Sequence, residues 1–369
     1  MQTLITNLFK KIDWWLLASS IFLMFFGLAA IYSVALGRGL GEFDNFRKQI
    51  LWLFISLGAA GGISFLDYRV FRYIGWIGYA VSIVLLILVL TPLGRVVNGA
   101  RGWFDFGFMS FQPVELTKIF LIIVLADICS RYSRTLYKFW HLIFLGAIVA
   151  MPLCLVALQP DFGSAMVLFF IWLAAFLLIV QKRWQVFLIF GLIITSLLFA
   201  WFFIFQDYQQ ARIFTFINPS LDPQGRGYNV RQSIIAVGAG KLMGRGLGFG
   251  SQSQLKFIPE SQTDFIFSVI AEEIGFVGVC LVLGLFGLFF FRLYRIATRA
   301  PDDLGMFIAL LTAALVFSHV FINIGMCVGL LPVTGISLPL VSYGGSFLLT
   351  MMILIGINLS IARYGRRAT

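Results

Sequence analysis

Long apolar runs recur from one end of this chain to the other, and they restrict its fold more than any other feature. A run of about 20 apolar residues crosses the hydrocarbon core of a bilayer as one helix. Of the 369 residues, 60% are hydrophobic and only 12% are charged, which is too little charge for the surface of a water-soluble protein of this length. We therefore expect an all-α membrane protein, with residues 1–369 forming a single polytopic membrane domain.

The apolar runs predict about ten transmembrane helices. The expected spans cover residues 14–33, 48–65, 73–90, 114–130, 139–158, 164–180, 184–205, 265–291, 305–330 and 339–362. The first run follows two lysines but has no small-residue cleavage site, so we interpret it as a retained span and not as a signal peptide. A long extracytoplasmic loop, residues 207–264, is expected between helices 7 and 8, because this segment is too polar and glycine-rich to span.

Basic residues concentrate in alternate connections between the expected spans. These connections hold 15 of the 27 Lys and Arg residues, namely Lys10, Lys11, Arg69, Arg72, Arg131, Arg134, Lys138, Lys182, Arg183, Arg292, Arg295, Arg299, Arg363, Arg366 and Arg367. The positive-inside rule then predicts a multi-pass protein of the cytoplasmic (inner) membrane with both termini in the cytoplasm. The formal charge of +11 is explained by this topology, and no nucleic-acid partner is expected.

The remaining connections are expected on the outer face, where they would carry the chemistry. They cover residues 91–113, 159–163, 207–264 and 331–346. The last of these is an apolar stretch interrupted by Pro and Gly, and irregular backbone at membrane depth is tolerated only where protein or a wet cavity covers it. We therefore expect a re-entrant or partly unwound element there, lining the same cavity as the other outer segments.

The cysteines and histidines show no metal-binding pattern. Cys129, Cys154, Cys280 and Cys327 all lie in apolar runs without CxxC spacing, so we expect buried, unpaired thiols. His141 and His319 each stand alone in apolar surroundings, and we expect them to be packing residues. No protein-ligated metal can be assigned from these residues.

Ionisable groups near the outer leaflet are functional candidates, because a charge in hydrocarbon costs at least a few kcal/mol. Glu115 and Lys118 are three residues apart on the fourth span and share one helix face, so they can neutralise each other. A purely structural ion pair is the alternative interpretation. Asp161 lies in the turn before the sixth span, at the same expected depth.

Asp264 opens the eighth span and is the strongest candidate for an extracytoplasmic base. Capping of the helix N-terminus by this carboxylate is the alternative explanation. Glu272 and Glu273 lie about two turns deeper, and we expect them to face the bundle interior and to pair with Lys118 or a polar neighbour.

The long outer segment combines cations with glycines. Its basic residues are Arg212, Arg226, Arg231, Lys241, Arg245 and Lys256, and a run of glycines covers residues 238–250. Such a loop can surround a phosphate with amide N–H groups and cations, although it matches no known nucleotide-binding fingerprint. A plain flexible loop explains the glycines equally well.

Five motifs resemble the shape, elongation, division and sporulation (SEDS) family of bacterial cell-wall proteins, and they occur in the family's order. They are FQPVELTK at 111–118, QPDFGS at 159–164, LDPQGRGY at 221–228, PESQTDFIF at 259–267 and LPLVSYGGS at 338–346. Within the family, QSQLKF at 252–257 is more similar to the elongation members, RodA, than to the division members, FtsW.

The resemblance implies a peptidoglycan glycosyltransferase that polymerises lipid II into β-1,4 glycan strands at the outer face of the cytoplasmic membrane during cell elongation. It implies the partners lipid II, undecaprenyl-pyrophosphate-linked glycan, a class B penicillin-binding protein and other membrane proteins of the elongation complex. A divalent cation, Mg or Mn, is expected to be able to assist, and no organic cofactor is expected. A general base and cations for the departing diphosphate are both required, since a base alone contributes only about 10²- to 10⁴-fold.

The resemblance also implies roles for individual residues. The catalytic residues are expected to be Asp264, as the general base, together with Glu115, Lys118 and Asp161. Substrate contacts are expected from Arg101, Arg212, Arg231, Lys241, Gln252, Thr263, Ser342 and Tyr343. The chain departs from the family pattern at two positions: Gln262 stands where many members have His, and Arg101 is displaced by one position.

Two other classes of function stay open from the residues. A lipid II flippase or transporter would also use intramembrane charges, a broken helix and a central cavity, although its site is expected near the midplane and not at the outer leaflet. A non-catalytic scaffold for wall-synthesis partners would suit the long helices but would leave the charge cluster unexplained.

Overall fold

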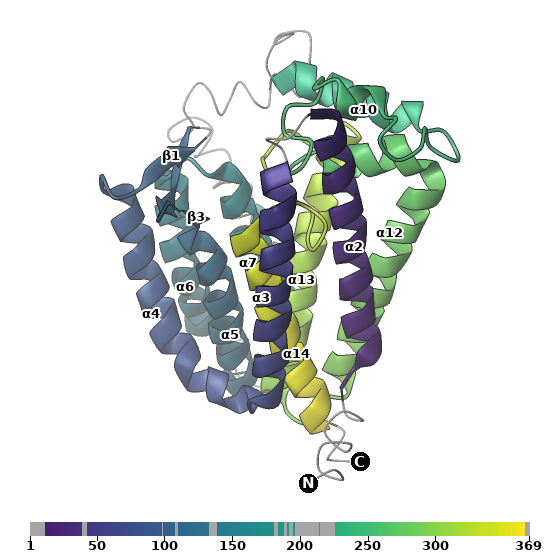
Figure 1. Ribbon diagram of the computed structural model, residues 1–369. Coiled ribbons are helices and arrows are strands. Elements are labelled where there is room, and N and C mark those ends of the chain that lie inside the picture. The colour runs from purple at the N-terminus through teal and green to yellow at the C-terminus, as the bar shows by residue number, and fades with distance from the viewer. Residues whose placement is uncertain are drawn as a thin grey trace.

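The computed structural model describes residues 12–38, 43–97, 99–107, 110–132, 139–180 and 226–365, with a few isolated residues between 184 and 214. These residues form a bundle of long helices with a cap of short elements at one end (Figure 1). Eight of the described helices are long and apolar enough to cross a membrane. They are α2 (Trp14–Arg38), α3 (Phe43–Phe65), α4 (Phe71–Leu90), α6 (Phe139–Leu158), α7 (Phe162–Ile179), α12 (Ile266–Thr298), α13 (Asp303–Cys327) and α14 (Gly345–Gly365).

A further helix, α5 (Pro113–Tyr132), carries charges within its length but lies inside the bundle. It packs against α4, α7 and α13, and its residues from Pro113 to Cys129 are almost all buried. Neighbouring helices, and not lipid, therefore surround Glu115, Lys118 and Asp127. This placement allows a charged helix to occupy the same layer as the apolar ones.

Nine of the ten expected spans coincide with described helices, and the expected span 184–205 lies almost entirely outside the described residues. The last span was expected to start at residue 339, which is wrong, because α14 begins at Gly345. The preceding backbone is irregular and includes Leu340, a non-glycine residue with a φ of 64°. The partly unwound element expected here is thus present; we call residues 331–344 the broken segment.

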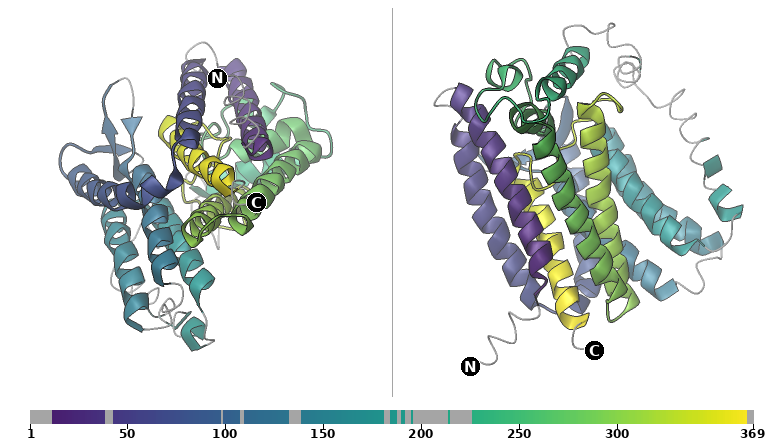
Figure 2. Two further views of the ribbon diagram at one scale, coloured as in Figure 1. Left: turned by 90° about the horizontal axis from the view of Figure 1, so that it is seen from below. Right: turned by 90° about the vertical axis from the view of Figure 1, so that its right-hand side faces the viewer.

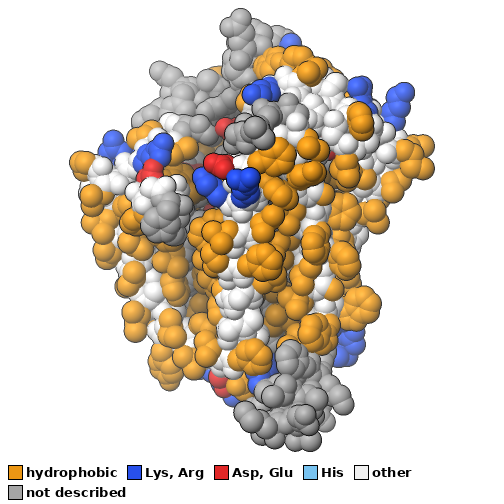
Figure 3. Space-filling model, in the orientation of Figure 1, with side chains coloured by type: hydrophobic (Ala, Val, Ile, Leu, Met, Phe, Trp, Pro, Cys, Tyr) orange, Lys and Arg blue, Asp and Glu red, His pale blue; other side chains and the backbone are white. Residues whose placement is uncertain are grey.

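The yellow helix α14 lies at the centre of the bundle (Figure 2). It packs closely on α3 and also contacts α5, α12 and α13. Hydrophobic side chains cover the flank of the bundle, while Lys, Arg, Asp and Glu gather at its two ends (Figure 3). Cys129 and Cys327 are buried as expected, whereas Cys154 and Cys280 lie on the surface of the bundle, so the expectation of four buried thiols is wrong for two of them.

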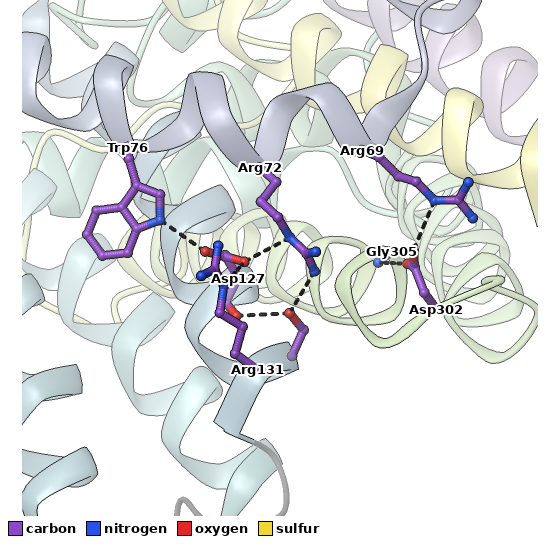
Figure 4. A network of polar contacts seen from close by, with 8 residues as sticks. Arg69, Arg72, Trp76, Asp127, Arg131, Asp302 and Gly305 are labelled. Carbon is purple, nitrogen blue, oxygen red and sulfur yellow. Dashed lines mark hydrogen bonds and ion pairs between the residues drawn. The ribbon is translucent and has the colours of Figure 1, made fainter.

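One end of the bundle, here called the arginine end, gathers the described basic connections. Asp127 of α5 bonds to Arg72 Nε at 2.9 Å, to Arg131 Nε at 2.8 Å and to Trp76 Nε1 at 3.0 Å (Figure 4). Asp302 bonds to Arg69 at 3.3 Å and caps α13 through the Gly305 amide at 2.9 Å. These contacts join α4 to α5, and the turn just before α4 to the start of α13.

A fourth ion pair at the arginine end is buried. Arg292 of α12 bonds to the Asp13 carboxylate through both Nε and Nη2. Asp13 also caps α2 through the Leu16 amide at 3.1 Å. The pair therefore fixes the start of α2 to α12, the helix on which α2 packs.

The opposite end, here called the loop end, carries the short elements. A small antiparallel sheet of β1 (Arg95–Val97), β2 (Ala100–Asp105) and β3 (Ser110–Phe111) covers α4 and α5, with Arg95 paired with Trp103 in the register of β1 and β2. This sheet was not expected from the sequence. On the other side lie α10 (Arg226–Ala239) and α11 (Ser251–Gln254), both within the expected long loop (Figure 1).

Candidate functional site

The broken segment is the point at which several motifs of the loop end meet. Ser342 Oγ donates to the Thr263 carbonyl at 2.6 Å and accepts from the Leu338 amide at 2.8 Å. The Tyr343 amide donates to the Gln262 carbonyl at 2.9 Å. The hydroxyl of Ser342 therefore joins the broken segment to the residues just before α12.

A glycine brings α7 against the same segment. A Cβ built on Gly163 would lie only 2.7 Å from the Thr334 carbonyl oxygen, which is closer than real Cβ atoms approach. Asp161 caps α7 two residues earlier, with Oδ1 3.0 Å from the Ser164 amide. Its Oδ2 accepts from Ser164 Oγ at 2.7 Å and from Gln112 at 3.2 Å. The absence of a side chain at Gly163 thus lets the Asp161 turn lie against the broken segment.

Asp264 lies where these elements converge. A Cβ built on Gly335 would lie 3.6 Å from Asp264 Oδ2, so the carboxylate faces the broken segment. The N-cap of α12 is Phe265, and the hydrogen bond recorded for the Asp264 carboxylate comes from the Thr263 side chain and not from an α12 amide, so a cap bond does not explain Asp264. Its backbone carbonyl accepts from Asn323 Nδ2 at 2.8 Å.

The electrostatic surroundings of Asp264 favour its protonated form. Burial, together with the negative charges of Glu260 and Asp161, raises the pKa of Asp264 to about 7, against an opposing hydrogen bond from Thr263. Among the described residues, no Lys or Arg forms a salt bridge with Asp264. A carboxylate with a pKa near neutrality can exchange a proton at physiological pH.

Glu115 and Lys118 form the expected pair inside the bundle. Lys118 Nζ lies 2.7 Å from Glu115 Oε1, and the two residues are only 1% and 4% exposed. Lys118 Nζ also lies 3.3 Å from Nε2 of His319. The second oxygen of Glu115, Oε2, is buried without a hydrogen-bond partner among the described residues. The pair therefore retains an unused acceptor, which a structural ion pair would not require.

The expected substrate contacts are distributed over the two sides of the loop end. Arg101 is exposed on β2, whose backbone bonds to Gln159 beside the Asp161 turn. Arg231 on α10 and Lys241 just after it are exposed on the opposite side. Arg212 lies outside the described residues.

Gln252 lies away from the broken segment, in α11. The backbone amide of Gln252 donates to Glu272 Oε1 at 2.9 Å, and the backbone amide of Ser253 donates to Glu272 Oε2 at 3.1 Å. Glu273 accepts from Ser253 and Gln254. The structure therefore shows neither Glu272 nor Glu273 paired with Lys118. The hydrogen-bond donors named here for the two carboxylates come from α11.

The glycine run packs as backbone and not as an open loop. α12 is broken at Gly275, whose φ is 75°, and the amides of Phe276 and Val277 donate to the carbonyls of Lys241 and Leu242. A Cβ on Gly275 would lie 2.2 Å from the Gly244 nitrogen. Glycines here permit two backbones to approach closely, so this part of the run packs against α12 and is not a plain flexible loop.

Several polar residues of the site were missed by sequence reasoning. Asn45 donates to Gln262 Oε1 at 2.9 Å, and Gln49 bonds to the Ser342 carbonyl and the Gly344 amide. Asn323 and His319 bond to the broken segment from α13. Their common signal is a polar side chain within an apolar run, which predicts burial against other protein groups but not which ones.

Known proteins share this sequence and architecture. The sequence profile of the FtsW, RodA and SpoVE cell cycle protein family matches residues 13–367. The peptidoglycan glycosyltransferase MrdB of Escherichia coli K12 is 39% identical over 301 residues, which is 78% of each chain. Stage V sporulation protein E of Bacillus subtilis is 36% identical over 362 residues, covering 96% of this chain and 98% of the relative.

Solved structures agree with these relatives. A chain of a peptidoglycan synthase complex, described for its coordination of polymerization and crosslinking, superimposes with a TM-score of 0.81 at 30% identity, covering 96% of this chain and 98% of the other. The rod shape determining protein RodA of Thermus thermophilus gives a TM-score of 0.71 at 29% identity, covering 95% and 97%. The chain therefore belongs to the FtsW, RodA and SpoVE family of cell cycle proteins.

Proposed function

We propose that this multi-pass membrane protein is a peptidoglycan glycosyltransferase that polymerises lipid II, with Asp264 as its general base. Relatives named as peptidoglycan glycosyltransferases support the reaction class. The observation that carries the role of Asp264 is its carboxylate, which faces the broken segment, has a pKa raised to about 7 by burial and forms no salt bridge with a described cation.

The residues divide the work of the reaction. A sugar hydroxyl of the acceptor attacks the anomeric carbon of the donor, the new C–O bond forms as the bond to the lipid diphosphate breaks, and the diphosphate leaves with the bonding electrons. Asp264 takes the hydroxyl proton. Since its pKa lies near 7, an appreciable fraction of the carboxylate is ionised at neutral pH and able to accept this proton. Inversion converts the α-linked donor into a β-1,4 product.

Cations must stabilise the departing diphosphate. Ser233 fixes α10 to α13 through the Cys327 carbonyl at 2.6 Å, and the Cys327 thiol lies 3.6 Å from the Asp264 carbonyl. The helix α10, which carries Arg231, is therefore on the same side of the loop end as Asp264, and Lys241 follows this helix. We assign diphosphate contacts to these two residues, with Lys118 as a deeper cation.

A resident metal does not fit the described side chains. Within the described parts of the chain, no three His, Cys, Asp or Glu residues gather as a metal site. We therefore propose that Mg or Mn, if required, arrives with the diphosphate of the substrate, and we route no step through a protein-bound ion.

Topology and partner belong to the same proposal. The basic connections of the arginine end suit the cytoplasmic side of the inner membrane, which would place Asp264 at the outer leaflet, within reach of lipid II. The solved relative from a peptidoglycan synthase complex supports pairing with a crosslinking class B penicillin-binding protein. The names of the relatives favour the transferase over the flippase.

The test uses purified protein in nanodiscs with fluorescent lipid II and Mg or Mn, with and without the partner. Wild type should make long glycan, and Asp264→Ala and Asp264→Asn should lower the rate by about 10²- to 10⁴-fold, because the proton acceptor is lost. Asp302→Asn, a carboxylate of the arginine end, is the matched control and should keep its polymerase rate.

The same preparation separates the three functions. Movement of lipid II between leaflets without polymer would support the flippase, and neither activity would support the scaffold. Wild-type rates from folded Asp264→Ala would remove this carboxylate from the role of base.

A further inference from the structure

His319 lies between the two parts of the site that the sequence motifs identify. It is 3% exposed on α13, with Nδ1 3.3 Å from the Ser337 carbonyl oxygen and Nε2 3.3 Å from Lys118 Nζ. Ser337 belongs to the broken segment, and Lys118 belongs to the buried ion pair on α5. The imidazole therefore touches both, although the sequence suggested only a packing role.

The two contacts require one particular form of the ring. A carbonyl oxygen can only accept a hydrogen bond, so Nδ1 must carry the proton. An ammonium group can only donate, so Nε2 must present its lone pair to Lys118. The neutral tautomer with the proton on Nδ1 satisfies both contacts, whereas a doubly protonated ring would place an N–H against the ammonium group.

Phe347 completes the surroundings of the ammonium group. Its ring stacks on His319 with centroids 4.7 Å apart, and Lys118 Nζ lies 5.6 Å from the centroid of Phe347. Glu115 Oε1 contacts the same ammonium group from α5 itself. Groups from α5, α13 and α14 thus hold one buried cation in a single place.

Asn323 connects this arrangement to the proposed base. It follows His319 by one helical turn, about 6 Å along α13, and its Nδ2 bonds to the Ile336 carbonyl at 2.6 Å and to the Asp264 carbonyl at 2.8 Å. His319 and Asn323 therefore hold two successive carbonyls of the broken segment. Because α13 is a continuous helix, it sets the spacing between Lys118 and Asp264.

We propose that His319 is a positioning residue for glycan polymerisation: its neutral imidazole orients Lys118 against the broken segment, so that Lys118 and Asp264 act on one bound substrate. This inference rests on the proposed function. Misplacement of a reacting group by about 1 Å can cost about 10²-fold in rate, so loss of the imidazole should mainly lower kcat.

Two substitutions at His319 separate positioning from packing. His319→Leu fills much of the space but can neither accept from Lys118 nor donate to Ser337, and its kcat should fall about 10²-fold with KM for lipid II nearly unchanged. His319→Gln offers both a carbonyl oxygen and an N–H, and it should recover the rate to within about threefold of wild type. His141→Leu is the control, since His141 stacks on Tyr132 at the arginine end, away from the broken segment.

The outcomes are decisive in both directions. A wild-type kcat in folded His319→Leu would overturn the proposal. It would also be overturned if the Leu and Gln variants lost kcat to the same extent and lost Tm to the same extent, because that result indicates packing alone. Failure of wild type to polymerise would instead contradict the proposed function.

A spectroscopic measurement tests the geometry without any activity. In protein labelled with ¹⁵N-histidine and carrying His141→Leu, the single remaining imidazole should show a protonated Nδ1 and a hydrogen-bonded, unprotonated Nε2. Lys118→Met should shift the Nε2 resonance. A doubly protonated ring, or an Nε2 signal unchanged by Lys118→Met, would overturn the assignment.

Discussion

The two ends of the bundle both hold carboxylates out of water, and they neutralise them in different ways. At the arginine end, Asp127 and Asp13 are each 3% exposed or less, and both bond to Arg side chains. At the loop end, Asp161 and Glu272 accept hydrogen bonds from amides and hydroxyls, and neither forms a salt bridge among the described residues. Glu115, with its bond to Lys118, is the exception among the buried carboxylates there, and the exposed Asp105 of β2 bonds to Arg95.

This difference indicates which carboxylates are structural. A carboxylate bound by one or two guanidinium groups has its charge and its lone pairs committed to the fold. A carboxylate held by neutral donors keeps its negative charge and can attract a proton or a cation from a substrate. The loop end therefore concentrates chemistry, and the arginine end joins helices.

The largest expected effect comes from breaking the ion pair between Glu115 and Lys118. Lys118→Met leaves Glu115 as an unpaired buried charge and should destabilise the protein by about 3–5 kcal/mol, seen as a lower Tm in detergent. The double variant Glu115→Gln with Lys118→Met removes both charges and should regain much of this stability. If polymerase activity returned together with stability, the pair would be purely structural. Glu115 would then belong with the helix-joining carboxylates of the arginine end.

A smaller effect is expected from Asp127→Asn at the arginine end. Its two arginine partners lose their counter-charge, but their side chains are 36% and 52% exposed and can turn to water, so the cost should be about 1–3 kcal/mol. Lipid II polymerisation per folded molecule should match wild type. A specific loss of kcat at unchanged Tm would contradict the division between the two ends.

The smallest effect is the dependence of the rate on pH. Asp264 must be ionised to accept a proton, and burial raises its pKa to about 7, so kcat/KM of the free enzyme should fall about tenfold for each pH unit below 7 and level off above it. Rates of polymerisation between pH 5.5 and 8.5 at low lipid II would show this. A flat profile would place the base elsewhere, and the profile of Asp302→Asn should match that of wild type.

Much of the site was predictable because its parts are local in sequence. Glu115 and Lys118 share a helix face at a separation of three residues, and Asp161 caps the helix that follows it. Pro and Gly in an apolar run predicted the broken segment. These features depend on helix geometry and on residue types within a few positions, which a single sequence records directly.

Other parts of the site could not be predicted in this way. The close packing of Gly244 on Gly275 requires two segments that only the fold brings together. The small sheet over α4 and α5 follows no alternating apolar pattern, and its strands are only two to six residues long. Sequence also gave no partner for Asn323, since a buried amide can bond to any carbonyl within reach.

The sequence by itself determined that this chain crosses a membrane repeatedly and where most helices run, because the thickness of hydrocarbon fixes the length of each apolar run. It also determined that charges gather at two ends. Tertiary structure alone decided which polar groups meet: Lys118 and His319 are 201 positions apart, and Asn323 and Asp264 are 59 apart. Such contacts depend on how the helices pack, and no local pattern of residues encodes that packing.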